Sequence, residues 1–241
     1  DLLANKNIDI SGIEVVKGGK TFFWSGLYHN DLNSRDTLDT QLNVLADFNP
    51  IVPANFKDAE VIMLGNLHPN IQISVLDQLT AKPKLVVLDT MNFWMDCALS
   101  ELKEVMKRID VITINDEEAR QLSGEYSLVK AAEVIHQMGP KYVVIKKGEH
   151  GALLFNDDHV FFAPAIPLKE VFDPTGAGDT FAGGFSGYLA QSENISFSNM
   201  KNAIIYGSNL ASFCVEKFGT ERMENLSMEE VDTRLQQFKM L

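Results

Sequence analysis

Residues 84–115 read KLVVLDTMNFWMDCALSELKEVMKRIDVITIN. Two short apolar runs, residues 84–90 and 110–115, stand on either side of the helix-like stretch 99–109. Apolar runs without polar alternation are typical of strands buried on both faces, and an intervening helix connects such strands in parallel. This part of the sequence therefore predicts a strand, a helix and a second strand of an α/β fold.

The same alternation continues on both sides of this stretch. A short apolar run at 60–66 precedes it and another at 141–148 follows, each beside a helix-like segment. The strand-like runs 151–155 and 159–164 come next, and the last third of the chain is helical. Since no internal repeat or linker separates two cores, we expect residues 1–241 to form a single α/β domain, with helices on both faces of a mostly parallel sheet.

Residues 13–29, IEVVKGGKTFFWSGLYH, carry many aromatic and β-branched side chains around a pair of glycines. Two such runs predict a β-hairpin at about 13–30, followed by a polar, turn-rich passage at 31–58. Trp24 falls on one face of the second run and Phe23 on the other, so the hairpin needs cover on both sides. It either closes as a lid over a ligand or packs against the lid of a second copy in a homodimer, and the sequence leaves both alternatives open.

The composition restricts the class of partner. The chain has 241 residues, a formal net charge of −12 and two cysteines, Cys97 and Cys214. Such an acidic protein does not attract nucleic acid or an anionic membrane by its overall charge. Two distant cysteines form no metal or redox motif, and no apolar run is long enough for a membrane span. We therefore expect small-molecule partners and, without an export signal in the first residues, a cytoplasmic protein.

One stretch carries the chemistry: FDPTGAGDTFAGGF, residues 172–185. Its proline and glycines are typical of a loop that leads into a helix, and the free N–H groups at a helix start attract an anion such as phosphate. Asp179 would repel that phosphate unless it moves a proton, so we expect it to be a general base for an attacking hydroxyl. The stretch lacks the third glycine of the dinucleotide motif and the lysine of the P-loop motif, which excludes both.

The sequence DPTGAGD at 173–179 resembles the second signature of the ribokinase-like (PfkB) family of carbohydrate and nucleoside kinases. Three further segments resemble family elements in the same order: the D-x-x-N of 89–92, the N-x-x-E of 115–118 and the glycine turn KGEHG of 147–151. Lys146 stands where many members have threonine. The resemblance covers nearly all of the chain and implies a ribokinase-like α/β fold with a small β-hairpin lid.

By this resemblance, Mg-ATP lies along the glycine-rich turn and Asp179 takes the proton of the hydroxyl that attacks the γ-phosphate. The amides of Gly176, Ala177 and Gly178 would form the anion hole, and Glu118 would act on Mg²⁺ through water. Some members also need a monovalent cation, which we expect as a further cofactor. The implied nucleotide-binding residues are Asn115, Glu118, Lys146, Gly148, Gly151, Thr175 and Asn209. The implied acceptor-binding residues are Asp179, Trp24 and Asn92.

The family's first signature, which grips the acceptor, has no counterpart in these residues. We therefore expect the chain to be a fragment in which the amino-terminal part of the family domain is not present. The acceptor stays open among ribose-like sugars, hexose derivatives and adenosine-like nucleosides. The alternative to a kinase is a non-catalytic nucleotide-binding or scaffold protein, which the missing acceptor region would permit.

Overall fold

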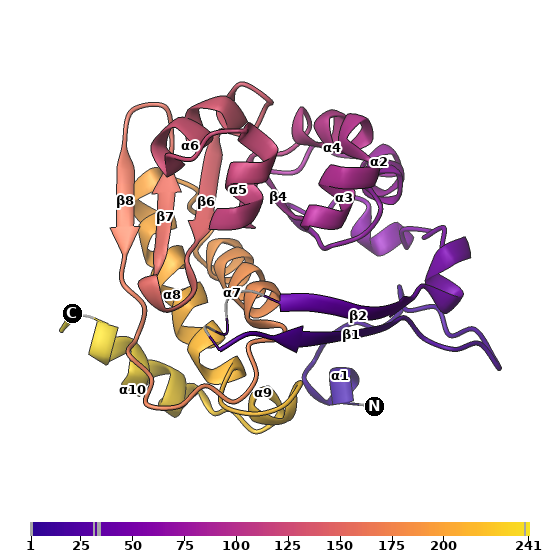
Figure 1. Cartoon of the computed structure of the whole chain (residues 1–241). Coiled ribbons are helices and arrows are strands. Elements are labelled where there is room, and N and C mark those ends of the chain that lie inside the picture. Colours follow the sequence, from indigo (N-terminus) through magenta and orange to yellow (C-terminus); the bar gives the residue numbers. More distant parts are fainter. Residues whose placement is uncertain (1, 31, 33–34, 239) are drawn as a thin grey trace.

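The computed structural model describes residues 2–30, 32, 35–238 and 240–241. These residues form a six-stranded sheet, which helices cover, and a separate two-stranded sheet (Figure 1). The first four strands of the large sheet pair in parallel and the last two pair antiparallel, so the predicted mostly parallel sheet is confirmed. In spatial order the strands are β3 (Val61–Leu64), β4 (Leu85–Asp89), β5 (Val111–Asn115), β6 (Tyr142–Lys146), β7 (Ala152–Phe155) and β8 (Val160–Ala163).

Helices cover both faces of the large sheet and form two apolar cores with it. Within β4, Val86 and Leu88 belong to one core, and Leu85 and Val87 to the other, because successive side chains of a strand point to opposite faces. The second face carries α7 (Ala177–Ser192) and α8 (Phe197–Cys214). The first face carries α2 (Pro69–Asp77), α3 (Asn92–Cys97), α4 (Leu99–Met106), α5 (Asp116–Ser123) and α6 (Leu128–His136).

The two helices of the second face pack unusually closely. A Cβ atom at Gly207 of α8 would lie 2.7 Å from the carbonyl oxygen of Phe181 in α7, so this contact requires glycine. The predicted capping box before the last helix is confirmed, because the Ser227 amide donates to Glu230 and the Glu230 amide donates to the Ser227 hydroxyl. The remaining helical elements are α1 (Leu2–Asn5), η1 (Asn43–Asp47), η2 (Ala54–Phe56), η3 (Gly148–His150), α9 (Glu221–Glu224) and α10 (Met228–Phe238).

The small sheet corrects the predicted hairpin at about 13–30. The second predicted strand is present as β1 (Phe23–Tyr28), but it pairs with β2 (Arg35–Gln41), which lies in the passage expected to be turn-rich. The glycine pair forms a tight turn in which the Gly19 amide donates to the Val16 carbonyl, and no strand precedes it among the described residues. The prediction was wrong because β2 is exposed along its whole length and Leu38 is its single apolar residue, so its sequence carries no apolar alternation.

Candidate active site

Three neighbouring parallel strands end in polar side chains at one edge of the large sheet. β4 ends at Asp89, β5 at Asn115 and β6 at Lys146. The carboxyl ends of parallel strands are the usual place of ligand sites in α/β proteins. The first turn of α7 meets this edge, because Asp179 lies close enough to both Asp89 and Lys146 for their charges to alter its pKa. We call Asp89, Glu118, Lys146 and Asp179 the carboxyl-edge cluster.

An ion pair between two strands forms the centre of this cluster. Lys146 Nζ lies 3.0 Å from Asp89 Oδ1, and the side chains are 18% and 9% exposed. Thr113 of β5, which lies between the two strands, donates its hydroxyl to the same carboxylate oxygen at 3.0 Å. Burial alone would lower the pKa of Lys146, but the charges of Asp89 and Glu118 raise it above its usual value. The surrounding carboxylates therefore favour the ammonium form of this lysine at the sheet edge.

Asn115 and Glu118 form a capping box at the start of α5. The Asn115 amide donates to Glu118 Oε2 at 2.7 Å, and the Glu118 amide donates to Asn115 Oδ1 at 2.8 Å. The residue Glu118 is only 4% exposed, and this burial raises its pKa to about 7 although the Lys146 charge opposes the shift. A carboxylate that needs a positive charge fits the oxygen-preferring, partly hydrated Mg²⁺ that the family resemblance implies.

The glycine-rich turn leaves two backbone amides without a backbone acceptor. Gly176 caps α7 with a φ of +81°, a left-handed conformation that favours glycine. The described chain provides no backbone acceptor for the amides of Gly176 and Gly178, whereas the Ala177 amide donates to the Pro174 carbonyl at 3.1 Å. Two of the three amides expected to form an anion hole are thus available, and the third must first release Pro174.

Asp179 lies in the first turn of α7 and keeps a solvent-accessible surface. Partial loss of hydration and the nearby Asp89 carboxylate raise its pKa above the usual value, while the Lys146 ammonium lowers it. A carboxylate with a raised pKa is a stronger base than a free one, which suits proton abstraction. Lys146 also approaches the helix start, since a Cβ atom on Gly178 would lie 3.0 Å from Lys146 Nζ.

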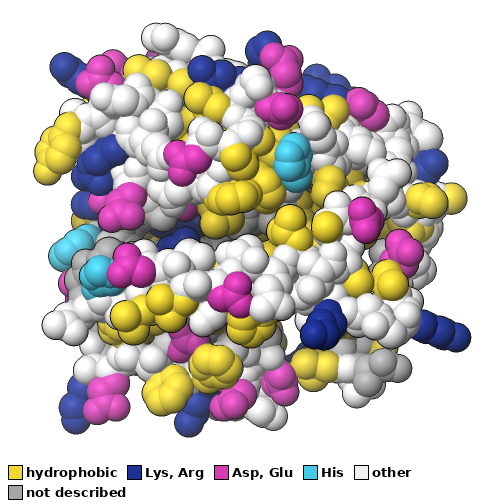
Figure 2. Space-filling view, turned by 45° about the vertical axis from the view of Figure 1, so that its right-hand side comes forward, with side chains coloured by type: hydrophobic (Ala, Val, Ile, Leu, Met, Phe, Trp, Pro, Cys, Tyr) yellow, Lys and Arg dark blue, Asp and Glu magenta, His cyan; other side chains and the backbone are white. Residues whose placement is uncertain are grey.

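The small sheet touches the glycine-rich turn. The hydroxyl groups of Tyr28, at the end of β1, and Thr175 form a hydrogen bond of 3.1 Å. Trp24 lies on the same strand, where its ring packs edge-on to Tyr28 and the Arg35 guanidinium lies 5.9 Å from the ring centroid. Figure 2 shows a hollow across one face of the molecule, with hydrophobic side chains gathered along it. We refer to β1 and β2 as the lid sheet.

The other predicted site residues lie outside the carboxyl-edge cluster. Gly148 and Gly151 bound the turn η3 after β6, close to Lys146 as expected, and the Lys147 amide donates to the Gly151 carbonyl. Asn92 directs its amide to Gln121 Oε1 of α5 at 2.7 Å, so its side chain joins two helices. Asn209 is fully buried and donates to the Val231 carbonyl of α10, and its contact with a nucleotide stays a prediction.

Sequence reasoning missed three participants in this site. The partnership of Asp89 with Lys146, the Thr113 hydroxyl beside it and the Tyr28 contact to Thr175 were not anticipated. A signal for the first was available, because both charged residues end apolar strands of the sheet that was predicted to be mostly parallel. The Tyr28 contact joins positions 147 residues apart, and no local pattern reveals such a contact.

A model of the pfkB family of carbohydrate kinases matches residues 1–226. The chain belongs to this family. It is 34% identical over 188 residues to a cytidine kinase of Thermococcus kodakarensis, a match that covers 75% of this chain and 66% of that protein. It is 32% identical over 134 residues to a ribokinase of Staphylococcus aureus, which covers 54% of this chain and 42% of the ribokinase. The matched part is therefore no more than about two thirds of these relatives' length.

Solved structures show the same fold. A nucleoside kinase of Methanocaldococcus jannaschii, described as an archaeal member of the ribokinase family, has a TM-score of 0.75 at 20% identity, covering 98% of this chain and 74% of the other. An aminoimidazole riboside kinase of Salmonella enterica, solved with aminoimidazole riboside and an ATP analog, has a TM-score of 0.74 at 19% identity, covering 97% and 80%. The ribokinase-like fold is thus confirmed. No described helix has the length and apolar character that crossing a membrane requires.

Proposed function

We propose that the protein transfers the γ-phosphate of Mg-ATP to a hydroxyl group of a sugar or nucleoside. The observation that carries this proposal is the position of Asp179, a solvent-accessible carboxylate with a raised pKa in the first turn of α7, beside the Lys146 ammonium and two free amides. A base, a fixed cation and oriented N–H groups are the parts that phosphoryl transfer needs, because this chemistry depends on positioning and charge stabilisation.

Asp179 is the general base in this proposal. Its carboxylate takes the proton as the acceptor oxygen forms a bond to the γ-phosphorus, and the bond from that phosphorus to the bridging oxygen breaks to release ADP. Loss of hydration and the Asp89 carboxylate raise the pKa of Asp179, and the nearby Lys146 ammonium opposes this shift. The proton therefore moves to a carboxylate that is more basic than usual.

The glycine-rich turn holds the transferred group. The amides of Gly176 and Gly178 point from the start of α7, where the helix dipole adds a partial positive charge. The Ala177 amide joins them only if it exchanges the Pro174 carbonyl for a phosphate oxygen, which makes it the weakest member of the anion hole. Thr175, at the start of the turn, and the η3 glycines Gly148 and Gly151 would contact the nucleotide.

Magnesium would be organised by Glu118 through a water molecule, with Asn115 holding the carboxylate in place. Bound there, the ion neutralises charge on the phosphates and orients them. The raised pKa of Glu118 fits such a role, since a nearby dication compensates the burial that now favours the protonated form. A monovalent cation on backbone carbonyls remains part of the proposal, as does a cytoplasmic location, where ATP is abundant.

The acceptor class follows from the relatives and the lid sheet. The relatives include a cytidine kinase and ribokinases, so pentoses and nucleosides are the first acceptors to test. Trp24 offers an aromatic surface on the strand whose end contacts the glycine-rich turn. The lid sheet also exposes Phe23, Leu27 and Leu38, an apolar surface that a second lid would cover in a homodimer. Asn92 would reach the acceptor only by leaving Gln121.

The test is Mg-dependent phosphate transfer from ATP to a panel of pentoses, hexoses and nucleosides, measured as phosphorylated product with the full-length protein. Asp179→Asn is the critical variant, and Asp157→Asn, an exposed aspartate in the turn between β7 and β8, is the matched control. We expect product from wild type and Asp157→Asn only. ATP binding without any transfer, over the whole panel, would instead support a non-catalytic nucleotide-binding protein.

A further inference from the structure

The pair of Asp89 and Lys146 connects strands that are not neighbours. β5 lies between β4 and β6, so the two side chains meet above it, at the level of Thr113. One carboxylate oxygen accepts both the ammonium and the threonine hydroxyl, each at 3.0 Å. Asp89 is therefore fixed from two sides, and the lysine is bound to an anchor that cannot easily move.

Such a pair is not explained by stability alone. Both side chains are largely removed from water, and the loss of hydration offsets most of the attraction between two buried charges. Apolar residues of similar size would fill the same space at least as well. The structure instead places an always-charged ammonium at a defined point, although a lysine side chain on its own is long and flexible.

That point is the start of α7. The distance of 3.0 Å from Lys146 Nζ to the place of a Cβ atom on Gly178 shows that the ammonium lies directly against the helix start, where a side chain would crowd it. The charges that face the ammonium come from every element around it: Asp89 from β4, Glu118 from α5 and Asp179 from α7. Arg35 of the lid sheet adds a positive charge that acts on Glu118.

We propose that Asp89 is a positioning residue for phosphoryl transfer, which holds the Lys146 ammonium against the glycine-rich turn so that Lys146 contacts the transferred phosphate. This inference rests on the proposed kinase function and names the residue that organises its fixed cation. The ammonium has three N–H donors, so it can keep one hydrogen bond to Asp89 and offer another to a phosphate oxygen. Lys146 is then the catalytic residue of the pair and Asp89 acts only through it.

The anchor also protects the general base. Without Asp89, the ammonium is free to turn toward the two carboxylates that remain around it, Glu118 and Asp179, and can form a direct ion pair with Asp179. A base held in an ion pair is a poor proton acceptor, and the phosphate loses its cation at the same time. Loss of Asp89 should therefore lower kcat even though Asp89 touches neither the acceptor nor the phosphate.

The test is a double-mutant cycle in the full-length protein with Asp89→Asn, Lys146→Met and the double variant. We expect each single change to lower kcat by roughly ten- to hundredfold, and the double variant to be no slower than Lys146→Met, because the two residues act as one unit. Additive losses, or an Asp89→Asn enzyme within twofold of wild type, would overturn the proposal. Lys141→Met, which removes an exposed lysine near the opposite end of β6, is the matched control and should leave kcat unchanged.

Two readouts separate positioning from a purely structural role. The acid limb of the pH–rate profile should move to lower pH in Asp89→Asn, where Asp179 loses the Asp89 charge and Lys146 approaches it, and to higher pH in Lys146→Met, where Asp179 loses its cation. Thermal stability should fall in Asp89→Asn, which leaves a buried lysine without its anchor, and recover in the double variant while activity does not. Acid limbs that do not move, or that move in the same direction in both variants, would contradict the proposal.

Two further comparisons keep the outcome clear. If Asp89→Asn does not fold, Lys146→Met against the double variant decides: equal kcat supports the proposal, and a further tenfold loss in the double variant overturns it. Asp179→Asn in the same assay separates the two hypotheses. An active Asp179→Asn enzyme defeats the proposed function, whereas an inactive one beside a fully active Asp89→Asn enzyme defeats only the positioning role.

Discussion

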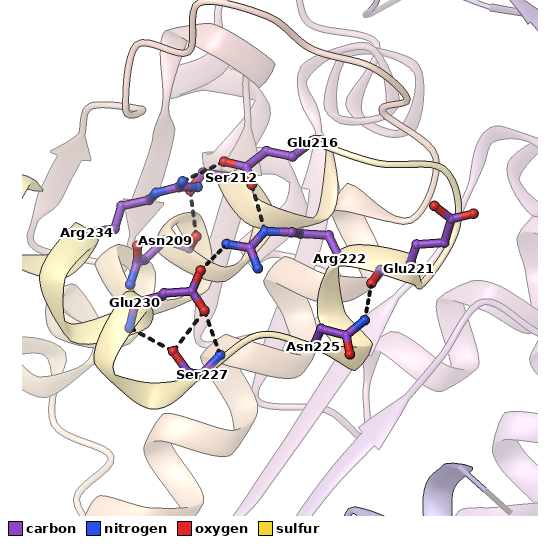
Figure 3. A network of polar contacts seen from close by, with 9 residues as sticks. All are labelled: Asn209, Ser212, Glu216, Glu221, Arg222, Asn225, Ser227, Glu230 and Arg234. Atoms are coloured by element: carbon purple, nitrogen blue, oxygen red, sulfur yellow. Dashed lines mark hydrogen bonds and ion pairs between the residues drawn. The ribbon is translucent and has the colours of Figure 1, made fainter.

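The charged residues that join α8, α9 and α10 differ from the carboxyl-edge cluster in their balance of charge. In this C-terminal network two arginines, Arg222 and Arg234, meet two glutamates, Glu216 and Glu230, in ion pairs of 2.5–2.8 Å (Figure 3). Arg234 also lies 3.4 Å from the centroid of the Phe213 ring. In the carboxyl-edge cluster, three carboxylates face the single ammonium of a lysine. In the C-terminal network the positive and negative charges are equal in number, whereas the carboxyl-edge cluster has more negative than positive groups.

The pKa values of Glu230 in the network and Glu118 in the cluster follow this difference in charge. In the network, the Ser227 amide and the Arg222 guanidinium lower the pKa of Glu230 to about 2, so its ionised form is stabilised by folding. In the cluster, burial raises the pKa of Glu118 to about 7, so its ionised form is destabilised by folding. The ion pairs of the network therefore contribute to the stability of the fold, whereas the burial of Glu118 opposes it, and a bound cation would offset that cost.

The largest expected effect comes from changing Asp179 of the cluster. Asp179→Asn removes the base and should lower kcat by roughly a hundredfold or more, because general base catalysis contributes about that much. Its unfolding temperature should equal or exceed that of wild type, since the cluster loses one of its uncompensated negative charges. Steady-state kinetics beside thermal unfolding measures both, and an active or much less stable variant would remove the distinction between the two charge groups.

The second prediction concerns magnesium. Glu118→Gln should raise the Mg²⁺ concentration needed for half-maximal rate by roughly ten- to hundredfold, the usual cost of losing a residue that acts on a metal through water. The capping hydrogen bond to the Asn115 amide can still form, because glutamine keeps an acceptor oxygen. Titration of the rate with Mg²⁺ tests this role, with Glu117→Gln, one position earlier in α5, as control. An unchanged Mg²⁺ dependence would exclude it.

The third prediction compares stability in the two regions. Arg234→Met should lower the free energy of unfolding by about 1–3 kcal/mol, because the bonds to Glu216 and Ser212 and the contact with Phe213 are lost. It should leave kcat within twofold of wild type. The control is Arg108→Met, which breaks a more exposed ion pair with Asp77 and should cost less than about 1 kcal/mol. Chemical denaturation measures the free energy of unfolding of both variants, and steady-state kinetics measures their kcat.

A fourth prediction uses pH without a ligand. Because the folded-state pKa of Glu118 is about 7 and its usual value is 4.5, the folded protein binds this proton more tightly than the unfolded chain. The Glu118 contribution to the free energy of unfolding therefore decreases as pH rises from about 4.5 to 7, and Glu118→Gln should abolish that decrease. For Glu230 the sign is opposite: its contribution is lost as pH falls from 4.5 to about 2, so Glu230→Gln alters only the acid range.

The smallest expected effect is at the lid sheet. Tyr28→Phe removes the hydrogen bond to Thr175 and keeps the ring, so it should raise the KM of the acceptor or ATP a few-fold, in line with about 0.5–1.5 kcal/mol for one hydrogen bond. Tyr126→Phe, an exposed tyrosine far along the chain, is the control. Identical KM values for wild type and Tyr28→Phe would show that the lid contact does not contribute to binding.

The large sheet and strand β1 of the lid sheet could be predicted from the sequence, and β2 could not. Buried strands such as β4 consist of continuous apolar residues, which local sequence reveals, whereas β2 is polar and exposed and forms only because β1 pairs with it. The glycine-rich turn was recognisable because its letters are local and contiguous. The pairing of Asp89 with Lys146 depends on the order of the strands in the sheet, which places β5 between β4 and β6. The burial of Asn209 depends on how α10 packs against α8.

The central claim is that the carboxyl-edge cluster transfers phosphate through Asp179. The most direct measurement is a single-turnover experiment with γ-labelled ATP, in which ATP binding and label transfer to the acceptor are followed in the same samples of full-length wild type and Asp179→Asn. We predict that both proteins bind ATP and that Asp179→Asn transfers label at least about a hundredfold more slowly. Equal transfer rates in the two proteins would contradict the account.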